Sequence, residues 1–149
     1  MSDMQELYQD LIKGHSKNPV NYREMADSSR KVEGYNPLCG DRFTVYLKLD
    51  NDIVKDISFQ GKGCAISTAS ASLMTQCLKG KTTAEAEAKF HDFHEFVIGE
   101  APNADEEALG KLIAFSGVRK FPARVKCATL AWHTLHSAIV GENKTVSTE

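Results

Sequence analysis

The strongest constraint on the fold lies between residues 42 and 60. Apolar residues alternate there with polar or aromatic ones, at Phe43, Val45, Leu47 and Leu49. A period of two indicates a strand with one buried face. The triplet Asp50-Asn51-Asp52 is a turn signal, and apolar residues resume at Ile53. We therefore predict a β-hairpin over residues 42–60, with a third strand near residues 31–36.

Helical patterns lie on both sides of this hairpin. We predict helices over residues 3–14, where Gly14 would end the helix, and then over 65–78, 84–98, 105–115 and 122–140. Thr82 or Thr83 would cap the helix 84–98, and residues 99–104 would form a loop. The predicted fold is α+β, with a small three-stranded antiparallel sheet packed against several helices. We expect a single domain over residues 1–149, with a flexible tail from residue 141 to 149.

Composition excludes several classes of protein. Hydrophobic residues make up 42% of the chain, which is sufficient for a packed core. The 18 basic and 20 acidic residues give a net charge of −2, so we expect no nucleic-acid partner. No apolar run approaches the ~20 residues that span a bilayer, so we expect no membrane partner. The acidic N-terminus lacks the pattern of a signal peptide, which favours a cytoplasmic location.

The chain contains four cysteines, Cys39, Cys64, Cys77 and Cys127. Their even number permits a disulfide interpretation, but thiols stay reduced in the cytoplasm. No pair has the C-x-x-C spacing of a thioredoxin-type redox motif. Free structural thiols and metal ligands therefore remain as the two interpretations.

Three of these cysteines fall at boundaries between predicted elements. Cys39 lies in a loop before the first long strand, Cys64 begins a helix, and Cys127 lies early in the last helix. Asp41 follows Cys39 by two residues, which places both on one face of an extended segment. Three thiolates and one carboxylate would complete a tetrahedral zinc shell. Spacing alone leaves structural cysteines as the alternative.

Nearby residues refine this hypothesis. Arg124 precedes Cys127 by about one helical turn, so its cation can offset the negative charge of the thiolates. We interpret Lys126 as a solvated helix residue. Cys77 lies about 220° around its helix from Cys64 and is interpreted as a packing residue.

Histidine offers a second possible set of ligands. His91 and His94 have i, i+3 spacing on one helix, and His133 and His136 have the same spacing on another. Neither pair has a third ligand nearby in the sequence. We interpret all four as surface or hydrogen-bonded histidines.

Three ordered motifs resemble those of the U-type iron–sulfur cluster assembly proteins. The first is Asn36-Pro37-Leu38-Cys39-Gly40-Asp41, the second spans residues 61–72, and the third spans 121–132. The resemblance covers residues 5–140. The general scaffold branch of that family has a histidine where this chain has Lys126. That difference, with an insertion within residues 80–119, resembles the SufU branch.

The resemblance implies both a site and an activity. It implies a SufE/NifU-like fold and a zinc site formed by Cys39, Asp41, Cys64 and Cys127. The expected function is that of a sulfur acceptor for a SufS-type cysteine desulfurase, which delivers sulfur to a downstream assembly complex or apoproteins. We take Cys39 as the sulfur-accepting nucleophile because its glycine-flanked loop can move.

Two alternatives remain. The same thiolates suit a scaffold for a transient 2Fe–2S or 4Fe–4S cluster. A structural zinc domain with a binding role is the other alternative, although such sites are normally closed by four cysteine or histidine ligands.

Overall fold

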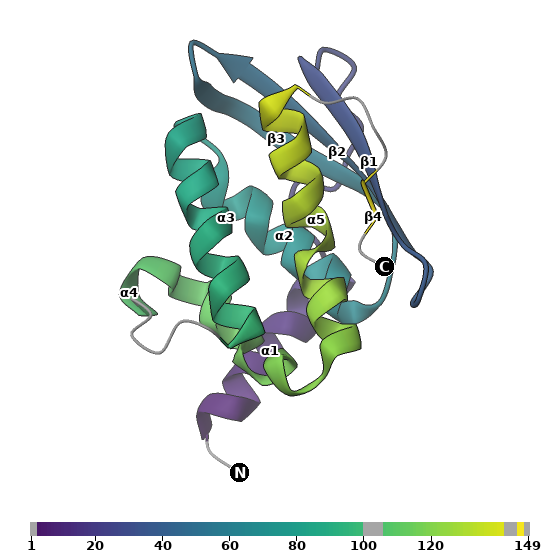
Figure 1. Ribbon diagram of the computed structural model, residues 1–149, viewed down its shortest axis with the longest axis vertical. Helices are drawn as coiled ribbons and strands as arrows, with labels where there is room; N and C mark the ends of the chain where they lie inside the picture. Colours follow the sequence, from purple (N-terminus) through teal and green to yellow (C-terminus); the bar gives the residue numbers. More distant parts are fainter. Residues whose placement is uncertain (1–2, 100–105, 142–145, 148–149) are drawn as a thin grey trace.

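The computed structural model describes residues 3–99, 106–141 and 146–147. Its elements in chain order are α1 (Asp3–Lys17), β1 (Arg30–Asn36), β2 (Asp41–Asp50), β3 (Ile53–Lys62), α2 (Ala65–Leu78), α3 (Thr83–Ile98), α4 (Glu106–Leu109), the 3₁₀-helix η1 (Gly110–Lys120), α5 (Pro122–Val140) and β4 (Val146–Ser147). Helices α2, α3 and α5 lie on one side of the sheet (Figure 1). No helix in the described ranges is long and apolar enough to cross a membrane.

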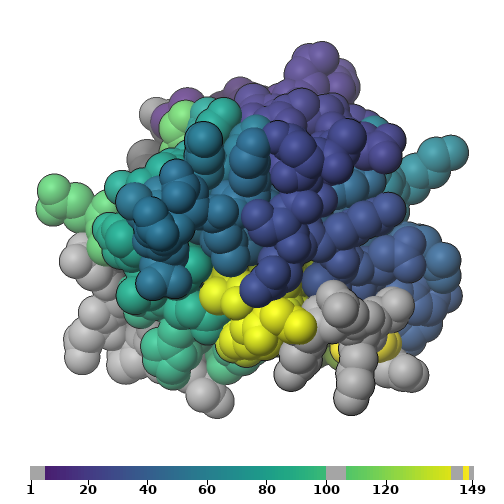
Figure 2. All heavy atoms as spheres, turned by 90° about the horizontal axis from the view of Figure 1, so that it is seen from above, coloured from purple at the N-terminus to yellow at the C-terminus, as the bar shows by residue number. Residues whose placement is uncertain are grey.

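The sheet confirms the predicted α+β class and adds one strand. Its strand order is β3-β2-β1-β4, and the pairs β1–β2 and β2–β3 are antiparallel, as predicted. Strand β4 pairs parallel with β1 at Gly34 and Tyr35. Figure 2 shows yellow atoms from the C-terminal part of the chain beside dark blue atoms from an early part of the sequence. The prediction of three strands was one short, because two residues in a polar tail present no detectable period.

The helices agree with the sequence except in two places. Helix α1 continues to Lys17 instead of ending at Gly14, since Asn18 N–H still donates to the Gly14 carbonyl oxygen and the His15 ring is hydrogen-bonded to Ser72. The helix predicted over 105–115 is a short α4 followed by the 3₁₀-helix η1. Gly110, with a φ of 57°, interrupts the α-helix there.

Two terminal predictions fall partly outside the described residues. Gly99 ends α3 in the left-handed conformation, while residues 100–104 of the predicted loop are not described. In the predicted flexible tail, Val146 and Ser147 are paired in β4. Flexibility elsewhere in residues 141–149 stays a prediction.

Small residues let α2 and α5 approach closely. Ser70 on α2 is fully buried and donates a 2.5 Å hydrogen bond to the Ala128 carbonyl oxygen on α5. The Trp132 indole N–H donates to the same hydroxyl at 3.1 Å. Because Ala128 follows Cys127 directly, this contact fixes Cys127 relative to α2.

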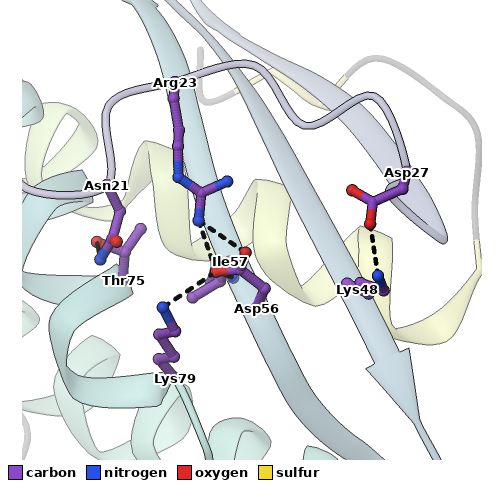
Figure 3. A network of polar contacts seen from close by, with 8 residues as sticks. All are labelled: Asn21, Arg23, Asp27, Lys48, Asp56, Ile57, Thr75 and Lys79. Carbon is purple, nitrogen blue, oxygen red and sulfur yellow. Dashed lines mark hydrogen bonds and ion pairs between the residues drawn. The ribbon is translucent and has the colours of Figure 1, made fainter.

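The segment between α1 and β1 is attached to β3 and α2 by polar contacts (Figure 3). Arg23 and Lys79 both reach the Asp56 carboxylate, at 2.7 and 3.4 Å. The Asn21 amide donates to the Thr75 hydroxyl at 3.1 Å. These contacts stabilise the end of α2 that lies opposite Cys64.

Close packing of α5 on β1 gives a first prediction. A Cβ at Gly34 would lie 2.0 Å from Thr134 Oγ1, whereas nothing lies within 4 Å of a Cβ at Gly14. We expect Gly34→Ala to lower the free energy of unfolding by about 1–3 kcal/mol through overpacking. Gly14→Ala, the matched control in α1, should raise it by up to about 1 kcal/mol. Urea unfolding measures both, and a Gly34→Ala variant as stable as the unmodified protein would contradict this packing.

Candidate metal centre

Three separate elements bring the predicted ligands to one end of the sheet. Cys39 lies in the turn between β1 and β2, Asp41 begins β2, Cys64 precedes α2, and Cys127 is in the second turn of α5. The positive φ of Gly40, 72°, lets the chain reverse between Cys39 and Asp41. Figure 1 shows this β1–β2 turn and the start of α5 toward the same end of the molecule.

Cys39, Asp41 and Cys127 converge. One carboxylate oxygen and the two sulfur atoms all lie within 4.8 Å of one another. The sulfur atoms of Cys39 and Cys127 are 3.2 Å apart. Two thiolates on one zinc ion would stand about 3.8 Å apart, so a small outward movement suffices for binding. Asp41 and Cys127 are buried, and Cys39 is exposed.

Cys64 lies beside this group but outside its 4.8 Å limit. Its sulfur accepts the Ser67 backbone N–H at 3.4 Å, so it caps α2, and its thiol donates to the Ser67 hydroxyl oxygen at 3.5 Å. Its own backbone N–H donates to Asp41 Oδ1 at 2.8 Å. Its sulfur is also within hydrogen-bonding reach of the Cys127 thiol.

Glycine leaves room for this arrangement. A Cβ at Gly63 would lie 2.8 Å from Asp41 Oδ1 and 2.4 Å from Ser67 Oγ. The absence of a side chain at Gly63 therefore allows the carboxylate to reach the N-terminus of α2. Sulfur and carboxylate oxygen are accepted zinc ligands, so the donor set fits that metal.

The thiols of Cys64 and Cys127 have pKa values that are shifted in opposite directions. A hydrogen bond from the Cys127 thiol, with further bonds from Ser67, lowers the pKa of Cys64 to about 6 against the opposing effect of burial. The same hydrogen bond to Cys64, together with burial, raises the pKa of Cys127. Both effects favour the thiolate on Cys64 over Cys127, and the thiolate is the form that binds metals.

Known proteins resemble this chain over most of its length. The NifU-like N-terminal domain family matches residues 7–128. The chain belongs to this family. It is 44% identical over 141 residues to the zinc-dependent sulfurtransferase SufU of Bacillus subtilis (strain 168), covering 95% of each protein. It is 42% identical to the iron–sulfur cluster assembly scaffold protein IscU of Streptococcus pyogenes serotype M1, covering 93% of this chain and 86% of the relative.

A solved crystal structure has the same fold as this chain. A crystal structure of a putative iron–sulfur cluster assembly scaffold protein for the SUF system, from Fervidobacterium islandicum AW-1, superposes with a TM-score of 0.84 at 36% identity. The match covers 91% of this chain and 98% of that one. The fold expected from the resemblance to U-type proteins is thereby confirmed.

The Arg124 side chain of this NifU-like domain packs against an aromatic ring. Its guanidinium carbon lies 5.5 Å from the centre of the Phe121 ring. The side chain borders a cavity of about 290 Å³ between α1, η1 and α5. In the described part of the chain, no hydrogen bond or ion pair joins Arg124 to Cys39, Cys64 or Cys127. Its role in charge balance stays a prediction.

Cys77 is remote from the site, as predicted. It lines a different pocket with Lys81, Lys89 and Lys111. Burial raises the pKa of the Cys77 thiol, which disfavours the thiolate form. A packing role therefore fits Cys77 better than a ligand role.

The histidines have partners of their own. His136 contacts Glu87 at 2.7 Å and His91 contacts Glu95 at 3.2 Å. His133 packs between the rings of Phe90 and His94. Among the described residues, only Cys39, Asp41 and Cys127 form a cluster of metal-ligand atoms within 4.8 Å of one another.

Sequence reasoning missed Asn36 as a member of the site. Its side chain is fully buried and donates to Asp41 Oδ2 at 3.3 Å and to Cys127 Sγ at 3.5 Å. Asn36 is the first residue of the first motif, but the resemblance assigned it no role at the site. The pairing of Asn36 with Asp41 across β1 and β2 was the available signal, but it requires the strand register.

The unequal thiols give a second prediction. In zinc-free protein, alkylation of Cys64 by iodoacetamide should reach half its maximal rate near pH 6, whereas an unperturbed thiol does so near about 8.5. Cys127→Ala should move this midpoint upward, because it removes the hydrogen bond that contributes most to lowering the Cys64 pKa. Peptide mass spectrometry measures each site, with Cys77 as the internal comparison. A Cys64 midpoint at about 8.5 or higher would contradict the prediction.

Proposed function

We propose that this protein acts in iron–sulfur cluster biogenesis as a zinc-dependent sulfur acceptor for a cysteine desulfurase. The observation that carries the proposal is the exposed Cys39 thiol, 3.2 Å from the buried Cys127 thiol and close to the buried Asp41. Similarity to the zinc-dependent sulfurtransferase SufU supports this function. The desulfurase is expected to be of the SufS type, and the proposed location is the cytoplasm.

Cys39, Asp41, Cys64 and Cys127 would hold the zinc ion, as predicted from the sequence. When bound, zinc would keep the thiols deprotonated at neutral pH. Cys127 and Asp41 are buried, and Cys64 adjoins the first turn of α2, so these three would hold their positions. Cys39, on a turn, can move without disturbing a helix.

The transfer step follows from these positions. Cys39 Sγ, as a thiolate, attacks the terminal sulfur of the persulfide on the desulfurase cysteine. A new S–S bond forms on Cys39, and the original S–S bond breaks. Its electron pair returns to the desulfurase cysteine, which leaves as a thiolate, so charge and atoms balance. A donor from the desulfurase, such as an imidazole, would take the coordination position that Cys39 vacates.

A cluster scaffold is the second candidate function. Similarity to the IscU scaffold of Streptococcus pyogenes favours it, and three thiolates can hold a 2Fe–2S or 4Fe–4S cluster. Sulfur transfer is preferred because Lys126 stands where the scaffold branch has a histidine. A purely structural zinc domain is disfavoured by the exposed Cys39 and by a carboxylate in the shell.

Metal analysis tests the ligand set. We expect one zinc per chain after purification without added iron, and a loss of at least about tenfold in zinc affinity for Cys64→Ser, Cys127→Ser and Asp41→Ala. Cys77→Ser is the matched control and should retain full zinc, since it lies in another pocket. Loss of zinc in the Cys77 variant alone would refute this ligand set. A coloured protein that passes an intact cluster to an apoprotein would instead support the scaffold function.

Sulfur mapping tests the nucleophile. After brief reaction of the zinc-loaded protein with desulfurase and cysteine, mass spectrometry should locate one added sulfur atom on Cys39. In the same assay, Arg124→Ala should slow formation of the adduct without lowering the thermal midpoint, since charge balance at thiolates affects reactivity more than folding. An adduct on Cys64 or Cys127 with Cys39 unmodified would defeat the assignment. Equal losses of stability and rate in Arg124→Ala would indicate a structural role for that residue.

A further inference from the structure

The side chain of Asn36 is fully buried and contacts three groups around the candidate centre. Its oxygen accepts the Leu38 backbone N–H at 3.3 Å. Its nitrogen lies 3.3 Å from Asp41 Oδ2 and 3.5 Å from Cys127 Sγ. A backbone N–H can only donate, so the amide oxygen must face Leu38. Both amide hydrogens are therefore directed at predicted ligands.

Hydrogen bonds from N–H groups are distributed unevenly over the four predicted ligands. Asp41 accepts from the Cys64 backbone and from Asn36, and Cys64 accepts from the Ser67 backbone. Cys127 accepts from Asn36. Within the described ranges, the only hydrogen-bond partner of Cys39 Sγ is the Cys127 thiol.

Metal binding removes the proton from the Cys127 thiol, so the contact between the two sulfur atoms then loses its hydrogen. Cys39 would become the only one of the three thiolates without a hydrogen-bond donor. Hydrogen bonds to a bound thiolate stabilise its charge and orient it. The sulfur without such a bond keeps the most electron density and is the most nucleophilic of the three.

Resting on the proposed function, we propose that Asn36 is a positioning residue that keeps Cys127 and Asp41 on the metal when Cys39 leaves. Asn36 is the last residue of β1 and pairs with Asp41 across the sheet. The turn that carries Cys39 begins after it. Movement of Cys39 therefore leaves the Asn36 amide and its two partners in place.

Zinc retention after selective blocking of Cys39 tests this proposal. The full-length, zinc-loaded protein is treated with iodoacetamide until mass spectrometry shows that only Cys39 is alkylated. Zinc is then titrated with a chromophoric chelator. The alkylated wild-type protein should keep its zinc, while the alkylated Asn36→Asp variant should bind zinc about 10- to 100-fold more weakly. Asn36→Asp keeps an oxygen that can accept the Leu38 N–H but lacks the amide donors.

Asn21→Asp is the matched control. The Asn21 amide donates to Thr75, about three helical turns along α2 from Cys64, so zinc affinity should not change. Asn36→Ala provides a second variant that adds no charge and should weaken zinc to a similar degree. Cobalt substitution supplies a spectroscopic readout, since the thiolate-to-cobalt absorption band should shift in both Asn36 variants and stay unchanged in Asn21→Asp.

Thermal unfolding separates positioning from a structural role. A positioning residue reduces the rise in thermal midpoint that zinc produces, whereas a structural residue lowers the midpoint equally with and without zinc. If the Asn36 variants lower the thermal midpoint equally with and without zinc and leave the cobalt spectrum unchanged, the proposal is overturned. Loss of zinc from the wild-type protein once Cys39 is alkylated would also overturn it. If the unmodified-sequence protein binds no zinc at all, the proposed function itself fails. Tight zinc binding by every variant refutes only the role of Asn36.

Discussion

The buried carboxylate of Asp41 holds the candidate centre together. One of its oxygens accepts the Cys64 backbone N–H at the start of α2, and the other accepts the Asn36 amide at the end of β1. A fully buried charge is costly unless hydrogen bonds or a cation compensate it. These two donors and the N-terminal end of the α2 dipole compensate it in part. The position of Cys64 relative to the sheet thus depends on Asp41.

The residues around Asp41 divide into a fixed set and a movable one. Cys127 is fixed because Ser70 joins α2 to α5 through the Ala128 carbonyl oxygen and the Trp132 indole. Gly34 permits α5 to lie directly on β1. Cys39, in contrast, lies in an exposed turn next to Gly40. The packing of the core therefore determines which thiols are rigid, and the turn determines which thiol is free.

Local patterns predicted most of the fold, and the resemblance of three motifs to a known family predicted which residues would form the site. The hairpin, α2 and α5 were predictable because their periodicity or capping depends on residues that are close together in the sequence. Cys39 and Asp41 were predictable as neighbours, since residues i and i+2 share a face in extended chain. The continuation of α1 past Gly14 was not predictable, because contacts with α2 stabilise it. The role of Asn36 depends on strand register and on a tertiary contact with Cys127 in the same way.

The three thiols of the site differ in burial, and this difference helps to decide between sulfur transfer and a cluster scaffold. A stable cluster requires all its ligands to be held together for as long as the cluster persists. Sulfur transfer requires one thiolate that reaches a partner while the others keep the metal. Here Cys127 is only 2% exposed, Cys64 is half-buried, and Cys39 is open to solvent. N–H donors reach Cys64 and Cys127, and among the described residues none reaches Cys39. Such an asymmetric set of thiols is poorly suited to hold a cluster equally from all sides. It is well suited to let one thiolate react with a partner while the others keep the metal.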